Sequence, residues 1–251
     1  MMTRRKFLAL GALAFPAAIA AEAAAEPTNL RVTHFALSGN RGLRFVHFTD
    51  FHYKGNARYA AEVIRTINQL APAFVCFTGD LVEDKRYLPE ALAFVRQIAA
   101  PVYGCPGNHD YWCHADFADY ARAFEQTGGA WLVDQSLVRP ADGLEIVGMA
   151  MIGIHALRAP KAPRRLLLMH YPAMADQLGD LRYDLILAGH SHGGQVRVPF
   201  FGAPVLPWGV GRYDLGYFET RGGPLYVNAG IGTYYFPYRF NCRPEVTAVT
   251  I

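Results

Sequence analysis

The order of apolar and polar positions divides the chain into two parts with different patterns. Between residues 43 and 127, short apolar runs alternate with segments whose apolar positions recur every three or four residues. These patterns predict strands at residues 43–49, 73–78 and 102–105, and helices at residues 57–70, 87–99 and 116–127. Pro72 and Pro101 follow the first two helices, where a proline cannot continue a helix. The alternation predicts strands packed between helices.

The second part of the chain is rich in predicted strands. Strand patterns bounded by glycine and proline occur at residues 144–154, 164–169, 184–188, 195–198, 213–220, 225–228 and 246–251, and only residues 173–178 look helical. No linker or repeat separates the two parts in the sequence. We therefore predict one α/β domain over residues 26–251, a sandwich of two mixed β-sheets flanked by helices. Sequence patterns leave the strand order open.

Residues 1–25 have the pattern of a secretory signal. The basic letters TRRK precede an apolar run over residues 7–21, and Ala18 and Ala20 fit an A-x-A cleavage site. The run is short for a membrane span, which needs ~20 apolar residues. The paired arginines before Phe7 and Leu8 resemble a twin-arginine (Tat) signal, which implies export by the Tat machinery to the periplasm or the outer face of the cell membrane. An uncleaved N-terminal anchor is the alternative.

Composition and charge narrow the class of protein. The chain has 251 residues, of which 52% are hydrophobic and 18% charged, as in ordinary globular proteins. Its formal net charge of +3 comes mostly from the leader, so we expect no nucleic-acid partner. The cysteines form no C-x-x-C pair, which argues against a zinc finger. Cys105 and Cys113 could pair in an oxidising compartment, but we favour free thiols.

Unusual polar residues follow five of the predicted strands. They are Asp50 and His52, Asp80, the run Asn108, His109 and Asp110, then His170, and finally His190 and His192. In open α/β sheets this edge is where ligands bind. Aspartate, asparagine and histidine together suit Zn²⁺, Fe, Mn²⁺ or Co²⁺, and they are too many for one tetrahedral ion. We predict two divalent ions, bridged by an aspartate whose two oxygens reach different metals. In each D-x-H or H-x-H pair, we expect the two side chains to project to the same side, as in an extended segment.

These motifs resemble the full signature of the calcineurin-like metallophosphoesterases over about residues 43–195. The segments GGQVRVPFFG, NAGIGT and RFNCRPE are similar to a small Tat-exported phosphodiesterase branch of that superfamily. The resemblance implies that one ion is held by Asp50, His52 and His192, that the other is held by Asn108, His170 and His190, and that Asp80 bridges them. It places His109 beside the substrate phosphate, where it protonates the leaving oxygen or stabilises charge, while a metal-activated hydroxide attacks phosphorus in line.

Three further residues are weaker candidates. We expect Asp110 either to orient His109 by a hydrogen bond or to cap a helix. Relatives often carry paired acidic residues after the strand that ends here near residue 154, whereas this chain has His155 and Arg158. These two could contact substrate phosphate, although we favour solvated loop residues.

The substrate class depends on two aromatic loops, residues 199–213 and 232–240. They could form an apolar wall for an acyl chain or make peripheral membrane contact, or their rings could simply anchor the loops. We expect a phosphodiesterase acting on a cell-envelope or lipid-linked phosphoester. Hydrolysis of a UDP-2,3-diacylglucosamine-type pyrophosphate is a candidate, but that substrate is cytoplasmic and conflicts with the leader. A phosphomonoesterase on the same centre and a non-catalytic metal-binding envelope protein are the alternatives.

Overall fold

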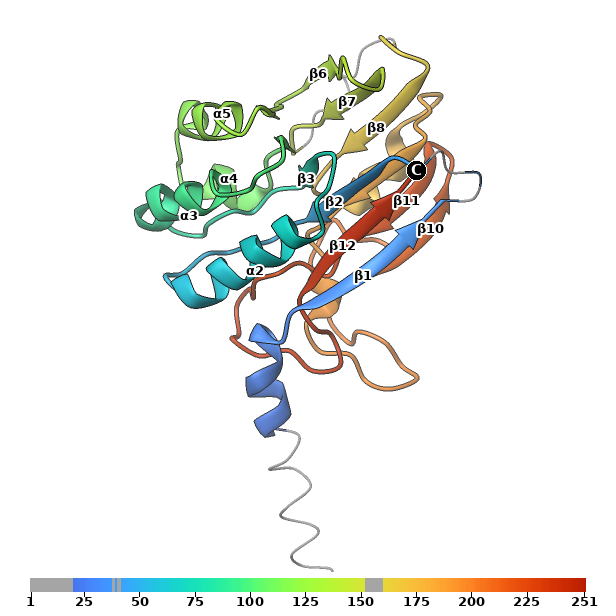
Figure 1. The fold of residues 1–251 in the computed structure, drawn as a ribbon. Helices are drawn as coiled ribbons and strands as arrows, with labels where there is room; N and C mark the ends of the chain where they lie inside the picture. Colours follow the sequence, from blue (N-terminus) through green and yellow to red (C-terminus); the bar gives the residue numbers. More distant parts are fainter. Residues whose placement is uncertain (1–19, 38, 40–41, 152–159) are drawn as a thin grey trace, which may run out of the picture.

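Two six-stranded sheets pack face to face in the computed structural model, which describes residues 20–37, 39, 42–151 and 160–251 (Figure 1). The first sheet has the order β1 (Arg31–Ala36), β12 (Glu245–Thr250), β2 (Arg44–Phe48), β3 (Val75–Phe77), β4 (Val102–Gly104), β5 (Ala130–Trp131). The second has the order β10 (Gly216–Thr220), β11 (Gly223–Val227), β9 (Leu185–Ala188), β8 (Arg164–Leu168), β7 (Leu144–Gly148), β6 (Gln135–Val138). Parallel and antiparallel pairs occur in both sheets, so the predicted α/β sandwich of mixed sheets is confirmed.

Three helices cover the outer face of the first sheet (Figure 1). They are α2 (Ala57–Gln69), α3 (Leu88–Val95) and α5 (Phe117–Glu125), close to the predicted helices. In α2 the buried residues Tyr59, Val63 and Ile67 recur every four positions and face the sheet. Asn56 caps this helix by accepting a hydrogen bond from the Tyr59 N–H. The outer face of the second sheet is covered by the 3₁₀ helix η4 (Pro172–Gln177), where the sequence also predicted a helix.

The core between the sheets is apolar and closely packed. Phe45 and Phe74 stack with ring centroids 4.6 Å apart, and Leu166 and Leu185 from the second sheet join the same cluster. The central strands β2, β3, β8 and β9 are buried on both faces almost throughout, which explains their continuous apolar runs. This rigid centre fixes the loops at the carboxyl ends of those strands.

Some elements differ from the sequence prediction. Residues 195–198 alternate like a strand but form only isolated bridges, Val196 with Phe240 and Val198 with Gly202, because the backbone of residues 193–195 turns through positive φ. The strand predicted at residues 144–154 is shorter in the structure, where β7 ends at Gly148. The short strands β5 and β6 carried too few residues for a pattern. The four cysteines are buried free thiols.

The N-terminal segment contacts the domain at the loop that contains residues 239–242. Most of the predicted signal peptide lies outside the described residues. Residues 20–25 are helical and lead into η1 (Glu26–Thr28). The Arg239 N–H donates to the Ala23 carbonyl, and the Glu26 carboxylate accepts from the N–H groups of Asn241 and Cys242. In the part of the chain that is described, no helix has the length and apolar character needed to cross a membrane.

Candidate metal centre

The predicted polar residues meet where the carboxyl ends of strands from both sheets face each other. Asp50, Asp80 and Asn108 follow β2, β3 and β4 of the first sheet, while His170 and His190 follow β8 and β9 of the second. All of them are buried. Residues up to 140 positions apart in sequence therefore contact one another across the sandwich.

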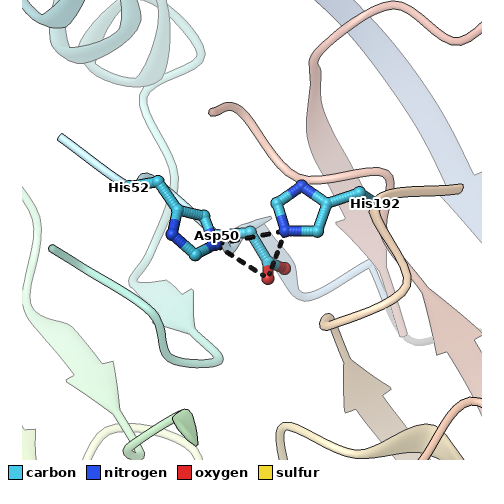
Figure 2. Close-up of side chains that lie close together, drawn as sticks. All are labelled: Asp50, His52 and His192. Atoms are coloured by element: carbon cyan, nitrogen blue, oxygen red, sulfur yellow. Dashed lines mark hydrogen bonds and ion pairs between the residues drawn. The ribbon is translucent and has the colours of Figure 1, made fainter. Parts of the chain in front are cut away.

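The first cluster contains Asp50, His52 and His192, whose side chains point toward one another (Figure 2). The Nε2 atoms of the two histidines are 3.1 Å apart, and Asp50 Oδ1 lies 3.2 Å from His192 Nε2 and 3.7 Å from His52 Nε2. Asp50 Oδ1 is buried and has no hydrogen-bond partner among the described residues. Two imidazole nitrogens and a carboxylate oxygen facing one point form a donor set that fits a divalent cation.

The second cluster contains Asp80, Asn108, His170 and His190. His170 Nε2 lies 3.1 Å from Asn108 Oδ1, 3.2 Å from Asp80 Oδ2 and 3.2 Å from His190 Nδ1. The same Asp80 oxygen is 3.5 Å from His52 Nε2 in the first cluster. The other oxygen, Oδ1, accepts a hydrogen bond from the His109 N–H. A single Asp80 oxygen thus faces both clusters, whereas the sequence prediction gave each ion its own oxygen of the bridging aspartate.

Backbone carbonyls set which nitrogen of two histidines carries the hydrogen. His170 Nδ1 is 2.7 Å from the Thr78 carbonyl, and His190 Nε2 is 2.6 Å from the Trp208 carbonyl. A carbonyl oxygen can only accept, so the hydrogen lies on these nitrogens. The lone pairs on His170 Nε2 and His190 Nδ1 then point into the second cluster. This arrangement is typical of metal-binding histidines.

Glu83 is a site residue that the sequence prediction missed. Its carboxylate lies 3.2 Å from His52 Nδ1 and 2.8 Å from the Lys54 ammonium. It therefore stabilises a hydrogen on Nδ1 and leaves His52 Nε2 to face Asp50 and the first cluster. The only signal in the sequence was an acidic side chain three positions after Asp80, which is too common a pattern to single out.

We expect Glu83→Gln to weaken metal binding without unfolding the protein. The amide removes the charge that orients His52, and loss of such a partner typically lowers metal affinity ~10–100-fold. Competition with a chelator of known affinity measures the change. Asp84→Asn is the matched control, because Asp84 is half-exposed and pairs with Arg86 instead. Equal affinity in the wild-type and Glu83→Gln proteins would show that the contact does not orient His52.

The buried aspartates make the site strongly attractive to positive charge. Burial alone would lower the pKa of His52, but the carboxylates of Asp50, Glu83 and Asp80 outweigh it and raise that pKa to about 9. Burial likewise opposes charge on His170, yet Asp80 and Asp50 raise its pKa to about 9. Despite their burial, the pKa values of Asp50 and Asp80 are lowered by the neighbouring histidines. A bound cation would be held by the same two carboxylates.

His109 lies beside the first cluster, in contact with two aromatic rings. The ring centroids of Trp112 and Tyr234 are each 4.9 Å from that of His109, and His52 is at the same distance. Burial lowers the pKa of His109 to about 4, so its ring is neutral near pH 7. Its nitrogen also lies close enough to His52 and Asp80 to form a third group of candidate ligands.

Of the two roles expected for Asp110, the structure shows helix capping and not the orientation of His109. Its carboxylate accepts from the N–H groups of Asp80 (2.8 Å), Leu81 (3.0 Å) and Gly107 (2.8 Å) and from the Tyr120 hydroxyl (2.7 Å). With both oxygens occupied, none of its contacts among the described residues reaches the His109 ring. Its bond to Gly107 caps the short helix α4 (Asn108–Trp112), and its bonds to the backbone at residues 80–81 fix the turn that carries Asp80.

The backbone is strained at the ligand positions. Asp50, His52, Asp80, His190 and His192 all have positive φ, from 43° at His52 to 68° at His190. Such conformations cost about 1–3 kcal/mol each and concentrate at functional sites. The side chains of the D-x-H and H-x-H pairs therefore converge through left-handed turns, and the prediction of extended segments is wrong. A Cβ on Gly189 would overlap Asp50, which explains the glycine before His190.

Two predicted candidates, His155 and Arg158, lie outside the described residues. The structure places all the other predicted site residues within or beside the two clusters.

Residues 43–194 match the family model described as calcineurin-like phosphoesterase. The chain is 28% identical over its whole length to YkuE, an uncharacterized metallophosphoesterase of Bacillus subtilis, covering 98% of that protein. It is 33% identical to the phosphodiesterase YaeI of Escherichia coli, over 61% of this chain and 58% of that one. It is 26% identical to the UDP-2,3-diacylglucosamine pyrophosphatase LpxG of Chlamydia trachomatis, over 88% of this chain and 89% of that one.

Proposed function

The chain belongs to the calcineurin-like phosphoesterase family, and we propose that within this family of hydrolases it is a phosphodiesterase that requires two divalent metal ions. The observation that carries the proposal is the single carboxylate oxygen, Asp80 Oδ2, that faces both donor clusters. Two ions at ~3.5–4 Å are a standard arrangement for displacement at phosphorus. A donor set of this kind suits Mn²⁺, Zn²⁺ or Fe.

Each cluster holds one ion in this proposal. The first is held by Asp50, His52 and His192, the second by Asn108, His170 and His190, and Asp80 lies between them. When bound, the ions supply Lewis-acid charge and lower the pKa of a water that attacks phosphorus. The protein's own residues orient these donors through Glu83 and the two backbone carbonyls.

His109 acts on the substrate side of the site. Its backbone N–H is held by Asp80, and its ring is steadied by Trp112 and Tyr234. A neutral imidazole in this position can donate its N–H to a phosphoryl oxygen and stabilise the charge that develops there. Asp110 contributes indirectly, by fixing the backbone at Asp80.

A diester substrate with an apolar part fits this chain best. YaeI is a phosphodiesterase and LpxG acts on an acylated sugar nucleotide, and both are similar to this chain. Exposed aromatic side chains, among them Trp208 and Phe236, lie on the two loops beside the site. We propose a cell-envelope or lipid-linked phosphodiester, reached after Tat-type export of the chain to the periplasm or the outer face of the membrane.

Two chromogenic esters test the reaction class. We expect the Mn²⁺-loaded protein to hydrolyse bis(p-nitrophenyl) phosphate with a higher kcat/KM than p-nitrophenyl phosphate. Protein treated with a chelator is the control and should be inactive until metal is restored. The reverse preference would make the protein a phosphomonoesterase. Failure to hydrolyse either ester with Mn²⁺ or Zn²⁺ bound would favour a non-catalytic metal-binding role.

A further inference from the structure

Large exposed hydrophobic side chains gather on two loops next to the metal centre. Phe200, Phe201, Val205 and Trp208 lie on one loop, and Tyr235 and Phe236 lie on the other; we call these six side chains the apolar rim. Their exposed fractions run from 66% for Phe236 to 110% for Phe200. The sequence alone left open whether the aromatic rings of these loops are buried anchors. These six are not buried, so anchoring cannot account for them.

The two loops form one continuous structure. The Arg197 N–H donates to the Phe240 carbonyl at 2.9 Å, and the Gln195 amide donates to the carbonyls of Phe236 and Tyr238. The rim also adjoins the metal centre directly, because the Trp208 carbonyl accepts from His190 Nε2. Any surface that covers the rim therefore lies beside the metal centre.

The N-terminal segment reaches the molecule at the same end. The hydrogen bond from Arg239 to the Ala23 carbonyl places residues 20–25 beside the second loop. Figure 1 shows this helix, in blue, extending from the same end of the sandwich as the orange loop of residues 199–213. The chain that precedes the helix is the apolar run of residues 7–21. A membrane that receives that run during export or anchoring would therefore face the rim.

The shape and chemistry of the rim favour a bilayer over a second copy of the chain. Phe200 stands at the tip of a tight turn closed by the Val198–Gly202 bridge, so it projects from the surface. Phenylalanine, tyrosine and tryptophan are the side chains that favour the lipid–water interface. At the base of the rim, Arg197 is paired with Asp214. Arg197 therefore brings no unpaired charge to the base of the rim.

We propose that the apolar rim inserts into the interface of a lipid bilayer, so that the metal centre opens toward the lipid headgroups. This inference deepens the proposed function and rests on it only for the substrate, which would be a phosphodiester carried at the membrane surface. The docking itself requires only the rim.

Fluorescence quenching of Trp208 by brominated lipids tests the insertion. The full chain carrying Trp112→Phe is mixed with phosphatidylethanolamine–phosphatidylglycerol vesicles whose acyl chains are brominated near the headgroup. We expect quenching that is lost when Trp208→Phe is added, because Trp131 is buried in the core. A chain held by its N-terminal segment alone would bind the vesicles and leave Trp208 unquenched, which would overturn the proposal.

A second variant separates docking from catalysis. Phe200→Ser together with Phe201→Ser removes two large apolar side chains. We expect this double variant to need a ~10-fold or more higher lipid concentration for half-maximal quenching of Trp208. Tyr217→Ser on β10 is the control for an exposed aromatic residue elsewhere. Made in the chain that keeps Trp112, the double variant should hydrolyse soluble bis(p-nitrophenyl) phosphate at the wild-type rate. If Trp208 is quenched but neither the wild-type protein nor the double variant hydrolyses the ester, the proposed function is contradicted and the docking proposal stands. If Trp208 is not quenched by the vesicles, and the chain self-associates unless Phe200 and Phe201 are replaced, the rim would instead bind a second copy of the chain.

Discussion

Asp80→Ala is expected to abolish metal retention and phosphoester hydrolysis together. The substitution removes the one oxygen that faces both clusters and the acceptor that holds the His109 backbone. Loss of a preorganised charge of this kind lowers kcat on the order of 10³-fold, and here both ion positions lose a donor as well. Metal content by elemental analysis and hydrolysis of bis(p-nitrophenyl) phosphate give the two measurements.

Asp180→Ala is the matched control for this experiment, because Asp180 is an exposed aspartate that pairs with Arg221 far from the site. Thermal unfolding followed by circular dichroism would establish that both variants are folded. Asp80→Ala protein that retains two equivalents of metal would contradict the bridging role. Asp80→Asn, which preserves the hydrogen bond to His109, separates that contact from the bridging charge.

His109→Ala should differ from Asp80→Ala in its metal content. We expect it to keep its metal and to lose most of its hydrolysis rate. His109 lies beside His52 and Asp80, and in the proposed reaction it acts on the substrate, where removing a positioned imidazole typically lowers kcat by ~10²–10⁴-fold. We expect the change in kcat rather than in KM, because the interaction strengthens as charge develops on the phosphoryl group.

His34→Ala provides the comparison for the histidine substitution, since His34 is an exposed residue of β1. Metal analysis must accompany the kinetics, because His109 also lies within ligand distance of His52 and Asp80. Normal turnover in metal-loaded His109→Ala would remove His109 from the reaction, and loss of one equivalent of metal would make it a ligand.

The sequence predicted most of the fold because its central strands are buried on both faces. Runs such as AFVCFT and LILA are continuous apolar segments, and polar residues directly after them mark one edge of a sheet. The strand pattern at residues 195–198 was misleading because the preceding residues, Gly193, Gly194 and Gln195, all have positive φ and direct the chain into a loop. Among the described residues, Val196 and Val198 find only isolated bridges, to Phe240 and Gly202.

What the sequence could not predict depends on contacts across the sandwich. The carbonyls of Thr78 and Trp208 orient two histidines, but a carbonyl carries no residue-specific signal. The contacts of Glu83 and Asp110 could not be predicted for the same reason. A carboxylate beside His109 in sequence bonds to the backbone at Asp80, while one three positions after Asp80 contacts His52. Their partners are set by the tertiary fold.

The turn that carries His190 and His192 has a consequence for how the two clusters move. It supplies one imidazole to each cluster, and its backbone is tied to Asp50 through the His190 N–H. A shift of the backbone in this turn would therefore reach both clusters, because the two rings are carried by neighbouring residues of the same strained segment.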